Sequence, residues 1–266
     1  MRPRAAVFAF HDVVPAAGLA EVPATHRPYA LDPREFHAHL LAAADSPRRA
    51  ILASRVPGEL GGGFFSLTFD DGTASDYEHV FPALVERRLR ATFFVVPTRI
   101  DTPGHVTWAQ LREMLAAGME IGSHSMTHPF LDALDEAGLR REFGDSKQLL
   151  EDRLGAPVRA ASLPRGWGPP ALAPVLRELG YHVFCTSRVG WWHPGDPPLS
   201  VPRVGVRRGM PVEEFAAIVD AQRGALWRLQ TVEAAKNAAK VCLGRRGWNR
   251  LRAPLLELLY RDGDVR

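Results

Sequence analysis

The stretch FFSLTFDDG, residues 64–72, places an apolar run directly before two adjacent carboxylates. A short run of this kind, preceded by the glycines of residues 61–63, is typical of a strand in a buried sheet. Asp70 and Asp71 would then lie at the carboxyl end of that strand. In parallel α/β proteins the functional groups gather at this edge, so the stretch predicts both a strand and the place of a site.

The rest of the chain alternates between strand and helix patterns around this stretch. We expect strands at 5–10, 64–69, 91–96, 120–121, 160–163 and 182–186, and helices at 33–44, 77–88, 107–117, 135–154, 170–179 and 211–221. Further helices are expected within 225–243 and 249–261, and a Pro/Gly-rich loop at 189–202. Alternation of this kind predicts an α/β fold of parallel strands with helices outside. The length of 266 residues suits a single barrel.

A second motif lies about fifty residues after the first. Residues 118–128 read GMEIGSHSMTH and place His124 and His128 four positions apart. Two imidazoles with one carboxylate form a three-ligand metal set with open positions, which is typical of hydrolytic rather than structural zinc. The remaining carboxylate of the Asp-Asp pair is a candidate general base. Pro129 favours a loop rather than a helix for the two histidines.

Together the two motifs resemble those of a known enzyme family. TFDDG at 68–72, followed by G-x-E-I-G-S-H-[ST]-x-x-H, resembles the polysaccharide deacetylases of the nodulation-factor and chitin-deacetylase type. The resemblance covers roughly residues 5–210. It implies a distorted (β/α) barrel with fewer than eight regular repeats. It also implies Asp71, His124 and His128 as metal ligands and Asp70 as the general base.

The general acid departs from the usual family pattern. Most members use a histidine in an L-x-H motif near the end of the barrel, but residues 199–204 read LSVPRV and contain no histidine. The opening FAFHDV at 8–13 instead resembles Y-H-x-[IV], found in a subgroup that acts on exopolysaccharides. In that subgroup the N-terminal histidine is the acid, which implies this role for His11.

The third family motif, R-P-P-Y-G, also departs. The matching stretch is SLPRG at 162–166. Pro164 and Gly166 fit a turn, and the family uses the amide at the position of Arg165 to hold the oxyanion. Ser162 replaces the arginine that supports the base. We expect Arg203 to supply that charge from a neighbouring strand, the alternative being a surface salt bridge.

Aromatic and histidine side chains outside the motifs are less specific. Trp167, Trp191 and Trp192 could stack on sugar rings beside the site, or could equally pack in the core or loops. The remaining histidines have no ligand spacing with a third partner and are expected to be structural: His26, His37, His39, His79, His105, His182 and His193.

Charge is concentrated at the end of the chain. The net charge is +3, and residues 223–266 contain ten Lys/Arg against four Asp/Glu. We expect a barrel domain at 1–222 and a basic helical extension at 223–266, packed on or beside the barrel. The extension is either a solvated helix pair or a peripheral contact with anionic lipid, such as phospholipid head groups or a lipid-diphosphate carrier. Without aromatic interleaving it does not indicate nucleic-acid binding.

The cysteines and the apolar runs of the sequence indicate where in the cell the protein is expected. Cys185 and Cys242 are far apart and predict no disulfide framework. The apolar run before His11 is too short for a signal peptide, and no window reaches the ~18 apolar residues of a membrane helix. The expectation is a cytoplasmic protein, with membrane association through the basic end as an option and a processed N-terminus as the alternative.

The resemblance implies a metal-dependent hydrolase. It would remove N-acetyl groups, in preference to O-acetyl groups, from amino sugars of a glycan or a lipid-linked exopolysaccharide intermediate. Zinc is the expected ion, although Co²⁺, Ni²⁺ or Fe²⁺ also suit an Asp-His-His set. Two alternatives stay open: a hydrolase of the same fold acting on a small non-sugar amide, and a catalytically silent glycan-binding module.

Overall fold

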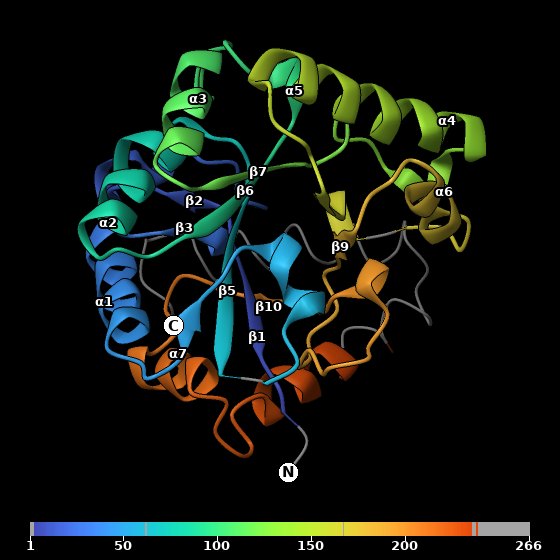
Figure 1. The fold of residues 1–266 in the computed structure, drawn as a ribbon. Coiled ribbons are helices and arrows are strands. Elements are labelled where there is room, and N and C mark those ends of the chain that lie inside the picture. Colours follow the sequence, from blue (N-terminus) through green and yellow to red (C-terminus); the bar gives the residue numbers. More distant parts are fainter. Residues whose placement is uncertain (1–2, 62, 167, 236–237, 239–266) are drawn as a thin grey trace.

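A parallel sheet occupies the centre of the molecule and helices surround it (Figure 1). The computed structural model describes residues 3–61, 63–166, 168–235 and 238. The main sheet has eight strands, ordered β10-β1-β5-β6-β7-β8-β9, with β4 also paired to β5. These strands are β1 (Ala6–Phe10), β4 (Arg49–Ala50), β5 (Phe64–Asp71), β6 (Ala91–Val95), β7 (Glu120–Ser123), β8 (Ala160–Ser162), β9 (Val183–Cys185) and β10 (Val204–Gly205). The predicted α/β class is therefore confirmed.

The sheet curls toward closure through the short segment around β10. Val201 forms a parallel bridge with Cys185 at the end of β9. Three residues later Val204 pairs with Phe8 of β1. Residues 201–204 thus pair with β9 at one side of the curled sheet and with β1 at the other. A separate two-stranded sheet, β2 (Asp12–Val13) with β3 (Ala30–Leu31), lies beside it.

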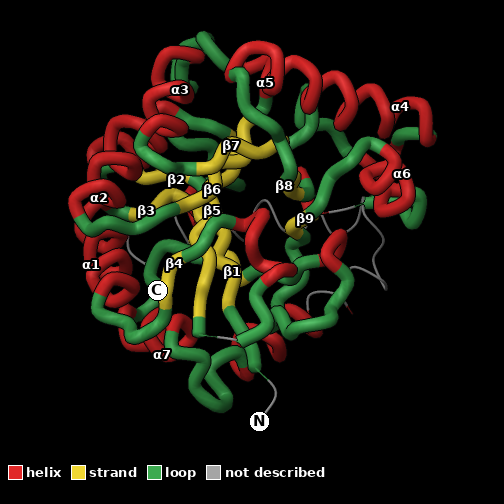
Figure 2. The backbone as a smooth tube through the Cα atoms, viewed as in Figure 1, coloured by secondary structure: helices red, strands yellow, loops and turns green. Residues whose placement is uncertain are grey.

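Helices lie around the outside of the strands, as Figure 2 shows in red and yellow. They are α1 (Pro33–Ala44), α2 (Phe81–Glu86), α3 (Trp108–Ala116), α4 (Glu136–Arg140), α5 (Ser146–Leu154), α6 (Leu172–Glu178) and α7 (Val212–Val219). The predicted bounds of α1 are confirmed, and Thr107 caps α3 through a reciprocal capping box with Gln110. Among the described residues, no helix has both the length and the apolar character needed to cross a bilayer.

Two of the predicted helices are interrupted. A π turn at Asp76–Val80 precedes α2, and another at Arg141–Asp145 separates α4 from α5. Periodicity does not reveal these changes because one π turn displaces the apolar face by only one residue. The predicted extension lies mostly outside the described residues; within them, residues 227–235 are helical.

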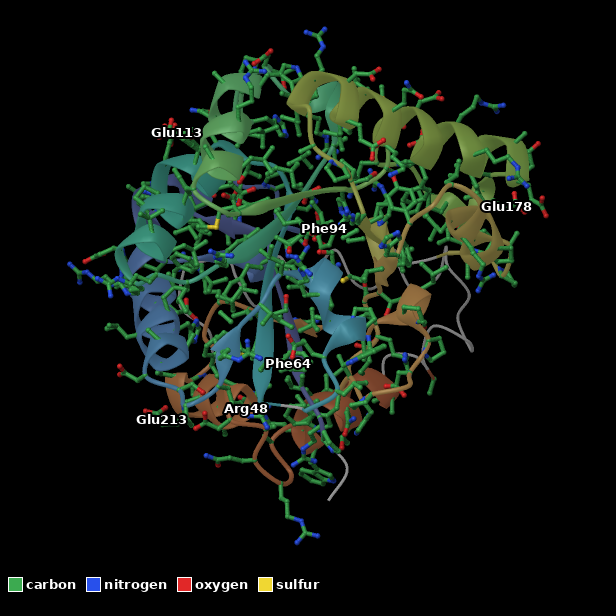
Figure 3. The ribbon with its side chains drawn as sticks, in the orientation of Figure 1. Arg48, Phe64, Phe94, Glu113, Glu178 and Glu213 are labelled. Carbon is green, nitrogen blue, oxygen red and sulfur yellow. The ribbon has the colours of Figure 1, made fainter. Side chains whose placement is uncertain are left out.

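Alternation along β5 separates the outer core from the barrel interior. Phe69 stacks between Phe10 and Phe93 with ring centroids 5.0 Å apart on both sides, on the face covered by α1 and α7. The neighbouring residue, Asp70, points to the other face, where its register partner is Phe94. Figure 3 shows Phe94 near the centre of the molecule.

The inner face requires glycine at one position of β7. A Cβ atom at Gly122 would lie 2.5 Å from the ring of Phe94 and 2.8 Å from the carbonyl oxygen of Ala160. Any side chain there would collide with a fixed backbone atom. The close approach keeps β6, β7 and β8 near one another just below the strand ends.

Candidate active site

The predicted site residues come together at the carboxyl ends of the strands. His11 follows β1, Asp70 and Asp71 end β5, and His124 follows β7. Ser162 ends β8, whereas Arg203 precedes β10, at its amino end, and its side chain extends to Asp70. Because the strands of this sheet are parallel, the carboxyl ends of β1, β5, β7 and β8 lie at one edge, which brings together residues as distant in sequence as His11 and Ser162.

Asp71, His124 and His128 form a compact donor cluster, as predicted. Their candidate ligand atoms lie within 4.8 Å of one another. Asp71 Oδ1 is 3.4 Å from His128 Nε2 and 4.0 Å from His124 Nε2. Ligand atoms around a tetrahedral zinc ion are separated by about 3.4 Å, given bonds of about 2.1 Å. The three side chains therefore fit a divalent cation in donor type and spacing.

Both imidazoles are in the form that a metal requires. Burial lowers the pKa of His124 below its ordinary value. Burial and the neighbouring His124 lower the pKa of His128 to about 3. A neutral ring keeps a lone pair for coordination.

The backbone of the cluster adopts left-handed conformations that side chains rarely take. The φ angles are +79° at Asp71, +63° at Ser125 and +61° at His128. The His124–His128 segment is a loop, as Pro129 predicted, and the His128 N–H closes it by donating to Ser125 Oγ at 3.0 Å. Backbone strain of this kind costs about 1–3 kcal/mol per residue and is typical of functional sites.

The Asp70 carboxylate is held by Arg203 inside the barrel. Nη1 and Nη2 of Arg203 donate to the two carboxylate oxygens, each at 2.7 Å. Both side chains are nearly inaccessible, at 2% and 3% exposure, so the surface salt bridge considered as an alternative is wrong. Burial alone would raise the pKa of Asp70, but the Arg203 charge outweighs it and holds that pKa well below its usual range. Asp70 is therefore ionised.

Ser162 links the donor cluster to Asp70, a role that sequence reasoning missed. Its hydroxyl donates to Asp70 Oδ1 at 3.3 Å and lies 2.6 Å from His124 Nδ1. A hydroxyl has one proton, so if it donates to Asp70 it accepts from the His124 Nδ1–H. That assignment leaves His124 Nε2 with its lone pair toward Asp71. The available signal was the serine at the position of the family's arginine.

We expect Ser162→Ala to weaken zinc affinity by about 10–100-fold, the usual effect of removing a hydrogen-bond partner of a ligand. A competing chelator titration would measure it. Ser66→Ala is the matched control, because the buried Ser66 hydroxyl on β5 has no hydrogen-bond partner among the described residues. Equal zinc affinity in both variants would show that Ser162 does not orient His124.

His11 faces the same edge from β1. Its half-buried ring packs against Tyr29 with centroids 4.8 Å apart. Its Nδ1 is buried and has no hydrogen-bond partner within the part of the chain that is described. Phe10 is the register partner of Phe69, so His11 follows β1 at the level where β5 reaches Asp70.

The turn after β8 reaches the ligand loop. Pro164 is buried, while Arg165 and Gly166 have positive φ angles of 56° and 73°. Arg165 Nε donates to the carbonyl oxygen of His128 at 3.1 Å. The turn predicted from Pro164 and Gly166 is thus present and is tied to the donor cluster.

The tryptophan prediction is corrected. Trp192 is 1% exposed and its backbone pairs with Ala5 before β1, at the end of the barrel opposite the site. Trp191 is half-buried under the Arg4 guanidinium, 4.7 Å from its ring centre. The Trp192 ring belongs to the interior cluster and Trp191 packs against the outer core, so neither is placed to stack on a sugar at the site. Trp167 lies outside the described residues.

Comparison with known proteins agrees with this geometry. The polysaccharide deacetylase family model matches residues 58–184. A chitooligosaccharide deacetylase of Sinorhizobium fredii is 34% identical over 184 residues, covering 63% of this chain and 80% of the relative. The solved structure of IcaB from Ammonifex degensii superposes with a TM-score of 0.70 at 27% identity, covering 82% of this chain and 97% of that one.

A further structure supports the fold. The Streptococcus pyogenes deacetylase PplD in complex with acetate has a TM-score of 0.73 at 21% identity, covering 82% of this chain and 99% of that chain. Fold, motifs and relatives agree. The chain belongs to the polysaccharide deacetylase family and is a carbohydrate deacetylase.

Proposed function

We propose that this protein is a metal-dependent hydrolase that removes N-acetyl groups, in preference to O-acetyl groups, from amino sugars. The substrate would be a glycan or a lipid-linked exopolysaccharide intermediate. One observation carries the proposal: the ionised, Arg203-paired Asp70 lies next to the Asp71, His124 and His128 donors. A site that only bound glycan would have no use for a base beside a metal-binding cluster.

Asp71, His124 and His128 would hold the cation, with zinc as the expected ion and Co²⁺, Ni²⁺ or Fe²⁺ as alternatives. A cation bound there supplies Lewis acidity toward water and the acyl carbonyl. The neutral imidazoles and the Ser162 contact support this assignment.

The protein's own groups supply the proton transfers. Asp70 accepts the proton of the attacking water, and Arg203 keeps the carboxylate ionised and oriented for that step. The Arg165 amide in the Pro164–Gly166 turn donates to the developing oxyanion. His11 donates a proton to the leaving amine nitrogen, so that acetate and a free amino sugar depart. The position of His11 directly after β1, at the edge where β5 reaches Asp70, supports this role.

The substrate class is supported by the relatives and by two stretches of sequence. The Sinorhizobium fredii relative is named a chitooligosaccharide deacetylase. The opening around His11 supports an exopolysaccharide. The basic residues of 223–266 support contact with an anionic lipid-linked carrier at a membrane surface.

A substrate panel would separate the proposal from its rivals. Acetate release would be measured with N-acetylglucosamine oligomers, an O-acetylated sugar of similar length and a small cyclic amide. We expect the fastest turnover on the N-acetylated oligomers. Preference for the cyclic amide would favour the non-sugar hydrolase, and saccharide binding with no turnover on a metal-loaded protein would favour the silent module.

His11→Gln is expected to lower kcat by about 10²-fold or more, the usual contribution of a positioned general acid. Zinc content should be unchanged because His11 is not in the donor cluster. His37→Gln, on the exposed side of α1, is the control. A near-normal kcat of His11→Gln on a substrate with an amine leaving group would exclude His11 as the general acid.

A further inference from the structure

Three arginines follow strands at the same edge as the site. Arg99 ends the short helix after β6, Arg165 follows β8, and Arg207 follows β10. The carboxyl ends of parallel strands meet at one edge, so the three cations belong to one rim. In the family motif the position of Arg165 is a neutral tyrosine, and this chain replaces it with a charge.

Two of these arginines contact the donor cluster directly. Arg99 Nη1 is 3.4 Å from Asp71 Oδ1. Arg165 bonds to the His128 carbonyl oxygen, and its guanidinium lies 4.4 Å from the ring centre of the exposed Phe130. Both arginines also contribute to lowering the pKa of His26 and of His128, so their charges reach across the site.

Arg207 borders the opposite side of the site. Its guanidinium lies 5.3 Å from the ring centre of Tyr29, and the same ring packs against His11. The metal-ligand side and the His11 side of the site are therefore both lined by cations.

The acidic side chains near this rim are already engaged. Asp70 is paired with Arg203, and Asp71 belongs to the donor cluster. Asp12 accepts hydrogen bonds from Ser75 and Thr73. Burial raises the pKa of Asp76 well above its ordinary value, which favours the neutral form of that group. Among the described residues no ion pair joins Arg165 or Arg207 to a carboxylate, and Arg99 is paired with Asp71 through Nη1 alone, so cations exceed free carboxylates along this rim.

We propose that Arg165 and Arg99 form a subsite for an anionic substituent, a phosphate or a carboxylate, carried on or next to the N-acetylated sugar. This inference rests on the proposed function and specifies its substrate class. A planar guanidinium binds either oxyanion through paired N–H donors, and such charge-assisted bonds are strong. An exposed arginine stacked on an aromatic ring is already ordered for this contact.

Equilibrium binding to the zinc-loaded full chain tests the inference without requiring turnover. Calorimetric Kd values would be compared for N-acetylglucosamine, N-acetylglucosamine 6-phosphate and a disaccharide of N-acetylglucosamine with glucuronic acid. We expect at least one anionic ligand to bind about tenfold or more tightly than the neutral sugar. Preference for one anion identifies phosphate or carboxylate as the source, and equal preference indicates recognition of charge alone.

Variants assign the preference to residues. Arg165→Gln should abolish the preference for the anion, measured within this variant as the ratio of the Kd values for the neutral and the anionic sugar, and Arg165→Lys should retain part of that preference. Arg188→Gln is the matched control, because this exposed arginine follows β9 but bonds to the Ser200 carbonyl oxygen. Equal Kd values for neutral and anionic sugars in the wild type, or equal weakening of both in Arg165→Gln, would overturn the inference. Acetate release from neutral oligomers tests the proposed function separately.

Discussion

Replacing Arg203 with methionine is expected to lower the free energy of unfolding of the metal-free protein by about 3–5 kcal/mol. The substitution leaves the Asp70 carboxylate charged inside the barrel, where its two oxygens have lost the paired Nη donors. It also removes the Nη1–H donated to Thr68 and the Nε–H donated to the Thr186 carbonyl oxygen. Urea denaturation of both proteins would measure the difference.

The double variant Asp70→Asn/Arg203→Met separates charge from packing. It buries no charge at this position, so it should be more stable than Arg203→Met alone although both lack the guanidinium. Arg203→Lys keeps a charge without the bidentate geometry and should be intermediate in stability. If the free energy of unfolding of Arg203→Met were within about 1 kcal/mol of the wild-type value, the Asp70–Arg203 pair would not stabilise the barrel as described.

Replacing Asp70 with asparagine is expected to reduce kcat for acetate release by about 10²–10⁴-fold. The amide is nearly isosteric with the carboxylate, but it cannot accept a proton from water. The donor cluster of Asp71, His124 and His128 is unchanged, so zinc should still bind. Steady-state acetate release at matched zinc content is the measurement.

Asp152→Asn is the control for this substitution, because Asp152 is exposed on α5 and its side chain accepts a hydrogen bond from Gln148, which is not a site residue. It should leave kcat unchanged. Because Asp70→Asn also leaves Arg203 without its anion, circular dichroism must show that the variant is folded at the assay temperature. A folded, zinc-loaded Asp70→Asn protein with wild-type kcat would exclude Asp70 as the base.

Much of the fold could be predicted because local patterns and global topology agree. The apolar run of β5 and the regular spacing of α1 mark their own boundaries. The donor cluster was predictable for the same reason, since Asp71, His124 and His128 each follow a strand of one parallel sheet. Placement at strand ends brings such residues together whatever their separation in sequence.

Other features depend on contacts that sequence patterns do not carry. The strand β10 has two residues, and its pairing with β1 depends on where the sheet curls. Trp192 lies in a predicted loop and was therefore a candidate for sugar stacking, but its side chain packs in a buried apolar cluster inside the barrel. Ser162 is uninformative alone and gains its role from lying between His124 and Asp70.

In the proposed function, deacetylation requires a cation bound by Asp71, His124 and His128. The most direct test is acetate release from N-acetylglucosamine oligomers by chelator-treated protein, before and after one equivalent of zinc is restored. We expect no acetate release without metal, recovery of release with zinc, and neither zinc binding nor recovery in His128→Ala. Full acetate release by protein shown to be metal-free would contradict this requirement.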